Sequence, residues 1–354
     1  MKTYTTTAQT SIDEEIQMLI KILQKKEFLS HSSDNPDKYI FEKSDNAFTR
    51  KARYLQAIRR YQSGSACGSF VKNGITYFHP NLAQDGFKTG CNFLRTDIFD
   101  YAKFRVKNKK KYETINEERL FNNFLSSQPM AFNLFYPLSN IIKEKDGKEI
   151  LANIVSKLIT TPLEIKSIEE VGIEYIPEYY KDCLNDKTAM DACFRYITTG
   201  NKKGIIAIET KYTDSLGTNE ASDPSTAITT ATERNGVFQL FTNVARETIR
   251  KKEIKMSQVY RNFLLTETVR LHDKLEDSVS VIIAPKENKS NKTDEKQLLD
   301  SLVDKFKYKF QILNLEEFVD AIIEGFPNQT VFKDFKRRYL DFQIAEFFLN
   351  KKNS

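Results

Sequence analysis

The chain has 354 residues, of which 40% are hydrophobic, including 26 Phe and 16 Tyr. This supply is sufficient for a sizeable core and excludes wholesale disorder. No stretch reaches the roughly 18 consecutive apolar residues of a membrane span, and no apolar signal core follows Met1, so we expect a cytoplasmic protein without a membrane segment. The net charge of +6 permits nucleic-acid binding without requiring it.

Cysteines and histidines are few and scattered. The four cysteines form no C-x-x-C pair, and the three histidines lie far apart in the sequence, which argues against a zinc site. Lysine and arginine instead gather in short clusters, each typical either of a solvated surface or of a nucleic-acid contact. These clusters are Lys107–Lys111, Arg250–Lys252 and Lys336–Arg338.

The first part of the chain shows helical periodicity. Ser11 and Glu14 form a capping box ahead of one apolar stripe, and five glycines between residues 63 and 90 indicate irregular structure with one short hairpin at most. An apolar segment from Met130 to Tyr136 lies between Pro129 and Pro137. Helices are predicted at about 11–28, 48–62, 93–106 and 114–126.

From about residue 165 the pattern changes to short apolar runs separated by turns and helices, which is typical of an α/β fold. Strands are predicted at 171–176, 190–198, 205–212, 278–283 and 308–313. Helices are predicted at about 236–252, 256–273, 296–306, 315–324 and 330–349. Residues 214–228 are rich in Ser, Thr, Asn and Asp and predict a loop.

A buried strand that ends in charged residues is the first candidate for a functional site. The apolar run that begins at Gly204 changes abruptly to Glu209-Thr210-Lys211. Because side chains alternate along a strand, Glu209 and Lys211 share one face, and Ile208, Thr210 and Tyr212 are expected on the other. Such a pair can be a simple ion pair at a sheet edge or part of a catalytic site.

The preceding strand brings a second acid to the same place. Asp191 lies at its start, and the turn over residues 199–204 predicts an antiparallel hairpin that places Asp191 near Glu209. Two adjacent carboxylates repel unless a cation or a proton lies between them, and hard oxygen ligands suit Mg²⁺ or Mn²⁺. Lys211 would orient a water or stabilise a charged phosphorane, so the set predicts phosphodiester hydrolysis.

A third acid is expected on the helix at 114–126. Leu120, Phe121, Phe124 and Leu125 define its buried stripe, and a helical wheel places Glu117 within that stripe and Glu118 at its margin. A buried carboxylate needs a partner, which is either a shared metal ion or a basic side chain of the core.

The order helix (Glu117), strand, strand (Asp191), strand (Glu209 and Lys211), helix, strand resembles the PD-(D/E)XK, or restriction-endonuclease-like, nuclease superfamily. The proline of that name is replaced by Met190. Further segments resemble a bacterial branch of restriction-type nucleases within it. These are Arg53–Gln56, Asn92–Leu94, Leu125–Pro129, Phe132–Phe135, Ile208–Asp214 and Arg338–Leu340.

The resemblance implies an α/β fold with a mixed central sheet flanked by helices and a helical N-terminal extension. We divide the chain accordingly into a helical region at 1–110 and a nuclease core with C-terminal helices at 111–354. The resemblance also implies that Asp191 and Glu209 bind the metal, that Lys211 is the catalytic lysine, and that Glu117 or Glu118 completes the site.

Several other residues are candidates for a role in the same site. Glu174 lies in an apolar setting on the first strand, where it would either join the site or form an internal ion pair. Cys193 is more typical of a small buried hydrophobe than of a nucleophile. Polar residues on the later helices are usually surface residues but could reach a substrate. They are Gln239, Arg246, Gln258 and Arg261.

These observations predict a Mg²⁺- or Mn²⁺-dependent endonuclease that cleaves double-stranded DNA. The alternatives are a nuclease acting on RNA or tRNA with the same fold, and an inactive nucleic-acid-binding scaffold. The complete set of Asp191, Glu209 and Lys211 argues against the scaffold. We also expect a homodimer, because a single site cuts one strand, and a role in restriction or phage defence by analogy alone.

Overall fold

The computed structural model describes residues 45–72, 75–213, 231, 236–251, 258–289 and 292–346. The helix predicted at 11–28 and the loop predicted at 214–228 lie outside the described residues. Contacts divide the chain into two compact units. The first comprises Met1–Asn92, Glu117–Leu125 and Lys336–Ser354, and the second comprises Phe93–Asn116 and Ser126–Phe335.

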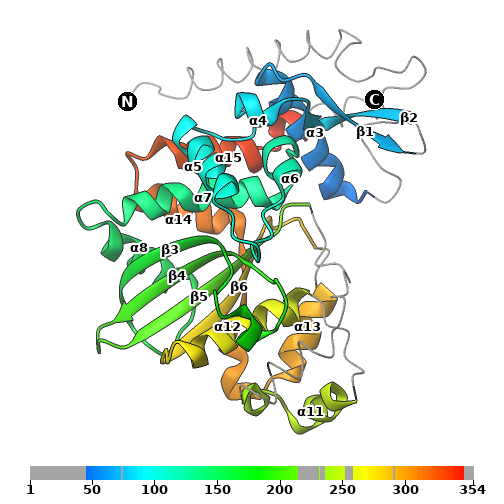
Figure 1. The fold of residues 1–354 in the computed structure, drawn as a ribbon. Helices are drawn as coiled ribbons and strands as arrows, with labels where there is room; N and C mark the ends of the chain where they lie inside the picture. The colour runs from blue at the N-terminus through cyan, green and yellow to red at the C-terminus, as the bar shows by residue number, and fades with distance from the viewer. Residues whose placement is uncertain are drawn as a thin grey trace. The chain divides into compact units, whose positions relative to one another are not determined.

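A five-stranded mixed sheet forms the centre of the second unit, in the order β3-β4-β5-β6-β7 (Figure 1). The first three strands pair antiparallel and the last two add in parallel. The predicted mixed central sheet flanked by helices is therefore confirmed. The strands are β3 (Ile165–Tyr175), β4 (Met190–Thr198), β5 (Lys203–Thr210), β6 (Asp277–Ala284) and β7 (Phe310–Asn314).

The β4–β5 hairpin has the predicted first strand and turn, whereas its second strand, predicted at 205–212, lies two residues earlier, at Lys203–Thr210. In the turn the Thr198 hydroxyl oxygen accepts a hydrogen bond from the Lys202 amide at 2.9 Å, and Asn201 adopts a left-handed φ of 58°. Short polar side chains suit such a turn because they bond to nearby backbone groups. Strand β5 ends at Thr210, and the Lys211 amide continues its ladder by donating to the Ile283 carbonyl of β6 at 2.9 Å.

Strand β3 begins six residues before the predicted strand at 171–176. Its first half contains Lys166, Ser167, Glu169 and Glu170, and the pairing to β4 is interrupted twice by irregularities. Polar residues at the edge of a sheet give no apolar alternation, so only the pairing with β4 identifies this half as a strand.

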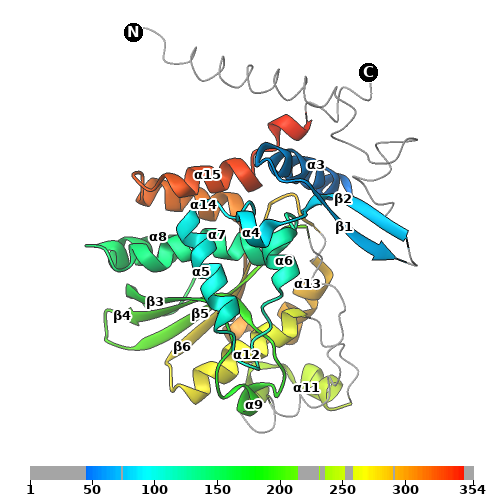
Figure 2. The same cartoon turned by 45° about the horizontal axis from the view of Figure 1, so that its top comes forward.

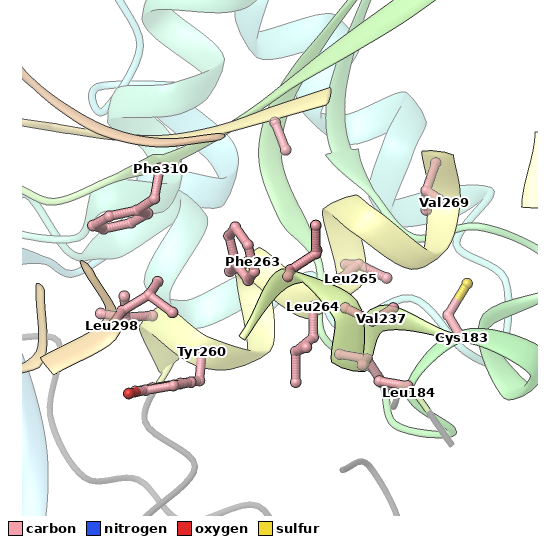
Figure 3. Close-up of a cluster of buried hydrophobic side chains, with 14 of the residues drawn as sticks. Cys183, Leu184, Val237, Tyr260, Phe263, Leu264, Leu265, Val269, Leu298 and Phe310 are labelled. Carbon is pink, nitrogen blue, oxygen red and sulfur yellow. The ribbon is translucent and has the colours of Figure 1, made fainter. Parts of the chain in front are cut away.

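One face of the sheet packs on α12 (Gln258–His272) (Figure 2). Figure 3 shows Phe263, Leu264 and Leu265 of this helix in a buried apolar cluster with Leu298 and Phe310. Ten of the fifteen residues of α12 are buried, including Asn262 and Glu267. A helix buried on most of its surface has no simple amphipathic stripe, and the sheet and the elements around it account for that burial.

The other face is covered by α7 (Ser127–Ile141), α8 (Gly147–Leu158) and α14 (Leu315–Gly325). Phe135 of α7 packs edge-on against Phe194 of β4 with ring centroids 5.9 Å apart. The sequence interpretation did not identify α7 or α8 as helices. Pro129 in α7 is tolerated because it lies in the first turn, where an amide hydrogen has no partner within the helix.

The remaining elements of the second unit connect and extend these layers. The helix predicted at 236–252 is a 3₁₀ turn followed by a separate helix that Thr242 caps with its side chain. These elements are α5 (Thr96–Lys107), α9 (Tyr180–Cys183), η3 (Val237–Leu240), α11 (Asn243–Arg250), α13 (Lys292–Ser301) and η4 (Asp304–Lys309).

The first unit contains the helix predicted at 48–62 and the expected hairpin. Its elements are α3 (Ala47–Gln62), β1 (Cys67–Lys72), β2 (Ile75–Ala83), α4 (Gly86–Thr89) and α6 (Glu117–Asn122). Helix α15 (Thr330–Tyr339) continues into it at Lys336. The two units interleave along the sequence, whereas the predicted division at residue 110 is linear and stays a prediction. None of the described helices is both long and apolar enough to cross a membrane.

Candidate active site

Three acids meet where β3 ends, β4 begins and β5 ends. In the register, Ile173 and Tyr175 pair with Ala192 and Met190, which places Glu174 opposite Asp191. Ala192 pairs with Ile208, so the next step of the same register places Asp191 opposite Glu209. Directly opposite residues of antiparallel strands are close neighbours, so the hairpin brings the two predicted acids together as expected.

Asp191 is held by Thr210. Its Oδ2 atom accepts a hydrogen bond from the Thr210 amide at 2.7 Å and from the Thr210 hydroxyl at 2.8 Å. The expectation that Thr210 points away from the site is therefore wrong. That expectation assumed that side chains alternate regularly between the two faces of the strand. Thr210 is the last residue of β5, where this alternation ends.

Glu209 and Lys211 form a buried ion pair, with Lys211 Nζ 2.6 Å from Glu209 Oε1. Glu209 is 4% exposed and Lys211 is 5% exposed. The prediction that the two side chains share a face is confirmed. A buried pair is stable only when further hydrogen bonds satisfy its remaining donors and acceptors.

Helix α12 supplies those hydrogen bonds. Gln258 donates through Nε2 to Glu209 Oε1 at 2.7 Å and accepts through Oε1 from Lys211 Nζ at 2.8 Å. Asn262, one helical turn later, donates through Nδ2 to Glu209 Oε2 at 2.7 Å. Both side chains therefore orient the same carboxylate.

Gln258 was among the weaker sequence candidates, and Asn262 was missed. The available signal was their spacing of four residues, which places both on one side of a helix. That signal gains meaning only when the side of the helix that faces Glu209 is known.

Burial raises the pKa of the Asp191 carboxyl group well above its ordinary value, and the nearby carboxylates of Glu209 and Glu174 raise it further. Lys211 and the Thr210 amide act in the opposite direction. The sheet thus places the carboxylates of Glu209 and Glu174 near that of Asp191, and like charges in such a place favour a bound cation or a proton.

Glu174 is 5% exposed and adopts a left-handed φ of 49°, which is uncommon for a residue with a side chain. Arg105 of α5 donates to the carbonyl oxygens of Ile173 at 2.6 Å and Glu174 at 3.2 Å. The Arg105 guanidinium group therefore supports the turned backbone at the end of β3.

The predicted helix acids have different surroundings. Glu117 is exposed at the first residue of α6, and Glu118 is also exposed and accepts a hydrogen bond from Asn122 at 2.9 Å. The helical-wheel expectation that Glu117 is buried is wrong. Helix α6 has only six residues, and its buried side is formed by Leu120 and Phe121 after the first turn. Both acids belong to the first unit.

Three other residues that the sequence offered as candidates are exposed, bonded to backbone groups or fully buried. Gln239 is exposed, and Arg246 donates to the carbonyl oxygens of Phe238 and Phe241. Cys193 is fully buried, and burial raises the pKa of its thiol to about 12. A thiol with that pKa is protonated at neutral pH, so the interpretation of Cys193 as a buried hydrophobe agrees with its surroundings.

The sequence segments that carried the family resemblance in the first unit bond mainly to backbone groups. Gln56 donates to the Arg338 carbonyl at 2.9 Å, and Arg338 donates to Asn92 Oδ1 at 2.6 Å. Asn92 in turn donates to the carbonyl oxygens of Leu120 and Asn123. These side chains satisfy buried carbonyl groups and so stabilise the first unit.

In the second unit the corresponding segments fix the start of α7. The Ser126 hydroxyl caps the helix by accepting from the Gln128 amide at 3.2 Å. Gln128 Oε1 accepts from the Asn116 amide at 3.3 Å, and Asn133 Oδ1 accepts from the Leu94 amide at 2.9 Å. These polar residues therefore connect the segment before α7 to the helix that covers the sheet.

The donor chemistry of the site suits a divalent cation. Within the described part of the chain, no group of three or more His, Cys, Asp or Glu side chains is placed to hold a metal ion. Mg²⁺, however, needs only one or two protein carboxylates beside waters and substrate phosphate, and Asp191 and Glu209 provide two. Asn262 Oδ1 is buried beside them without a hydrogen-bond partner among the described residues, which leaves one acceptor for a bound group.

Comparison with known proteins assigns the chain to a family. No curated protein and no solved structure matches it. A family profile described as the PD-(D/E)XK nuclease superfamily matches residues 43–341, which include β3, β4, β5 and α12. With the acids and the lysine located at adjacent strand ends, the chain belongs to the PD-(D/E)XK nuclease superfamily.

Proposed function

We propose that this nuclease hydrolyses phosphodiester bonds of double-stranded DNA and depends on Mg²⁺ or Mn²⁺. Asp191 and Glu209 hold the cation, and Lys211 is the catalytic lysine. The observation that carries the proposal is the placement of Asp191 opposite Glu209, with Lys211 Nζ 2.6 Å from the Glu209 carboxylate. This arrangement joins two carboxylates and an amine at adjacent strand ends.

Each side chain has a distinct task in hydrolysis. Thr210 orients Asp191, while Gln258 and Asn262 fix both oxygens of Glu209. The Lys211 ammonium group donates hydrogen bonds to oxygens of the scissile phosphate as negative charge develops on them, and a preorganised donor in a dry site is effective for that purpose. The bound cation supplies further charge neutralisation and lowers the pKa of water.

A third carboxylate is proposed to complete the cation site. Glu117 was predicted from the sequence for this role, and Glu174 is the acid that lies beside Asp191 on the neighbouring strand. Substitution of each acid in turn distinguishes which of the two completes the cation site.

Plasmid nicking tests the proposal directly. Wild-type protein is incubated with supercoiled DNA and Mg²⁺ or Mn²⁺, with and without EDTA, beside Asp191→Ala and Lys211→Ala. We expect cleavage that EDTA abolishes and that both substitutions reduce at least about 10²-fold. Lys202→Ala is the control, because Lys202 pairs with Glu276 in the turn at the opposite end of the same hairpin.

Equal nicking by Asp191→Ala or Lys211→Ala would overturn the assignment of these residues. RNA of the same sequence is assayed in parallel, and faster cleavage of RNA would overturn the choice of DNA. A homodimer is proposed because duplex cleavage needs two cuts, and sedimentation of a monomer at working concentration would contradict it. A role in phage defence is proposed by analogy, and loss of protection against phage in the Asp191→Ala strain tests it.

A further inference from the structure

The structure also holds a basic surface beside the candidate active site. We infer that it binds the sugar-phosphate backbone of duplex DNA and so positions the strand for cleavage, an inference that rests on the proposed function. The surface, here called the lysine arm, consists of Lys107, Lys109, Lys110, Lys111 and Lys187.

The lysine arm is exposed along its length, since all five of its lysines are exposed. Three acids within or beside it have partners of their own: Glu178 pairs with Lys110, Glu113 pairs with Arg105 at 3.0 Å, and Asp186 accepts from the Thr188 amide at 2.8 Å. The arm therefore keeps a positive excess. A polyanion that lies against it gains by releasing its condensed counterions, which is the main source of sequence-independent DNA binding.

Hydrogen bonds attach the lysine arm to the end of β3 that carries Glu174. Arg105 donates to the Glu174 carbonyl and to Glu113, and Glu113 accepts from the Lys110 amide at 2.7 Å. Three consecutive contacts thus connect the backbone beside Asp191 to the backbone of the arm. The arm is fixed at the acid-bearing end of the sheet by these contacts.

The segment before β4 holds the other side of the arm. Lys187, which lies four residues before Asp191, donates through Nζ to the Lys111 carbonyl at 3.2 Å. Tyr112 stacks on Tyr180 of α9 with ring centroids 5.5 Å apart. Because the arm contacts the end of β3 on one flank and the segment that leads into β4 on the other, a backbone bound along the lysines passes beside these strand ends. In Figure 2 the segment after α5 runs toward α9.

The position of the lysine arm offsets the negative charge of the candidate active site. The gathered acids repel a phosphodiester, whereas nearby ammonium groups attract it. Lysine contacts of this kind carry no base information, so the inference concerns affinity and strand placement rather than a recognition sequence.

The experiment measures binding apart from cleavage. Full-length Asp191→Asn protein in EDTA is titrated against a fluorescent DNA duplex, and anisotropy is recorded between about 50 and 200 mM KCl. The test variant adds Lys107→Gln, Lys111→Gln and Lys187→Gln. The control variant adds Lys143→Gln, Lys145→Gln and Lys157→Gln, which remove the same charge from exposed positions near or on α8.

We expect the test variant to bind at least about tenfold more weakly, with a salt slope smaller by about three units, since each phosphate contact contributes about 0.9 to the slope. The control should change both quantities much less. Equal losses in the two variants would overturn the inference, as would unchanged binding by the test variant. A duplex RNA bound more tightly than DNA would overturn the choice of DNA as the occupant.

Failure of this inference can be distinguished from failure of the proposed function. If the test variant binds normally while Asp191→Ala abolishes nicking, the lysine arm is wrong and the catalytic assignment stands. If the test variant loses binding while Asp191→Ala still nicks DNA, the arm stands and the catalytic assignment is wrong.

Discussion

Thr210 directs two hydrogen-bond donors, its amide and its hydroxyl group, at the single oxygen Oδ2 of Asp191. The two bonds fix the carboxylate of one strand to the end of the next, and they leave Oδ1 for other partners. This relationship makes the hairpin pairing of β4 and β5 a direct determinant of the acid's orientation.

Removal of the Thr210 hydroxyl group should therefore impair the site more than the fold. We expect Thr210→Val to reduce activity about 10- to 100-fold, which is typical for loss of a group that orients a metal ligand. The unfolding free energy should fall by only about 0.5–1.5 kcal/mol, which is the usual net contribution of one hydrogen bond. Thr198→Val, in the turn at the other end of β4, serves as the control in plasmid nicking and urea denaturation. Equal loss of activity in both variants would contradict this role.

Gln258 should act as a positioning residue for both members of the ion pair. Gln258→Leu deprives Glu209 and Lys211 of one partner each, and we expect a roughly 10- to 100-fold drop in activity. Divalent-ion affinity, measured by calorimetry, should fall as well. Gln311→Leu is the matched control, because Gln311 also bonds through both ends of its amide, to the backbone of Thr160. Unchanged ion affinity in Gln258→Leu would limit its role to packing.

The third acid can be identified by two conservative substitutions. Glu174 is buried beside Asp191 and Glu117 is exposed on α6, so we expect Glu174→Gln to weaken Mn²⁺ binding by about 10- to 100-fold. Glu117→Gln should leave it unchanged. Titration calorimetry of both variants measures this, and the reverse order of effects would restore Glu117 as the ligand predicted from the sequence.

The raised pKa of Asp191 predicts a definite pH dependence of stability in the absence of divalent ions. An acid whose pKa is higher in the folded than in the unfolded state favours folding less as pH rises above its ordinary value of about 3.9. Wild-type protein in EDTA should therefore lose stability relative to Asp191→Asn from about pH 4 upward. Urea denaturation across this range measures the difference. A constant difference in stability at all pH values would show that the surroundings of Asp191 do not raise its pKa.

A second buried charge network lies at the opposite end of β6 and should affect stability alone. Lys309 Nζ lies 2.9 Å from Glu267 Oε1 and 3.2 Å from Asp277 Oδ1. Lys309→Met leaves Asp277 buried without the Lys309 cation, whereas Glu267 keeps its pair with Arg270 at 2.9 Å, and the unfolding free energy should fall by about 3–5 kcal/mol. The folded fraction should cleave DNA normally. Lys307→Met breaks an exposed pair with Asp304 and should leave the unfolding free energy nearly unchanged.

Alternation and turn chemistry predicted the strand that carries Asp191 to the residue and predicted the hairpin that joins it to β5. These features are local, because a strand buried on both faces is apolar throughout and a tight turn needs particular residues. Helix α7 was missed for a related reason. Pro129 and Pro137 interrupt the expected helical pattern, and burial on nearly all sides of α7 removes the polar stripe that marks a surface helix.

The sequence by itself determined that charged residues lie in a buried setting. Glu209 and Lys211 stand at the end of an apolar run, and Asp191 begins the strand before it. Tertiary structure alone decided which partners complete that arrangement. Asn262 and Gln258 reach Glu209 because α12 packs against the sheet, and Glu174 joins Asp191 because β3 pairs with β4 in one register. Contacts between residues far apart in the chain depend on packing and register, and neither is encoded in the periodicity of a single segment.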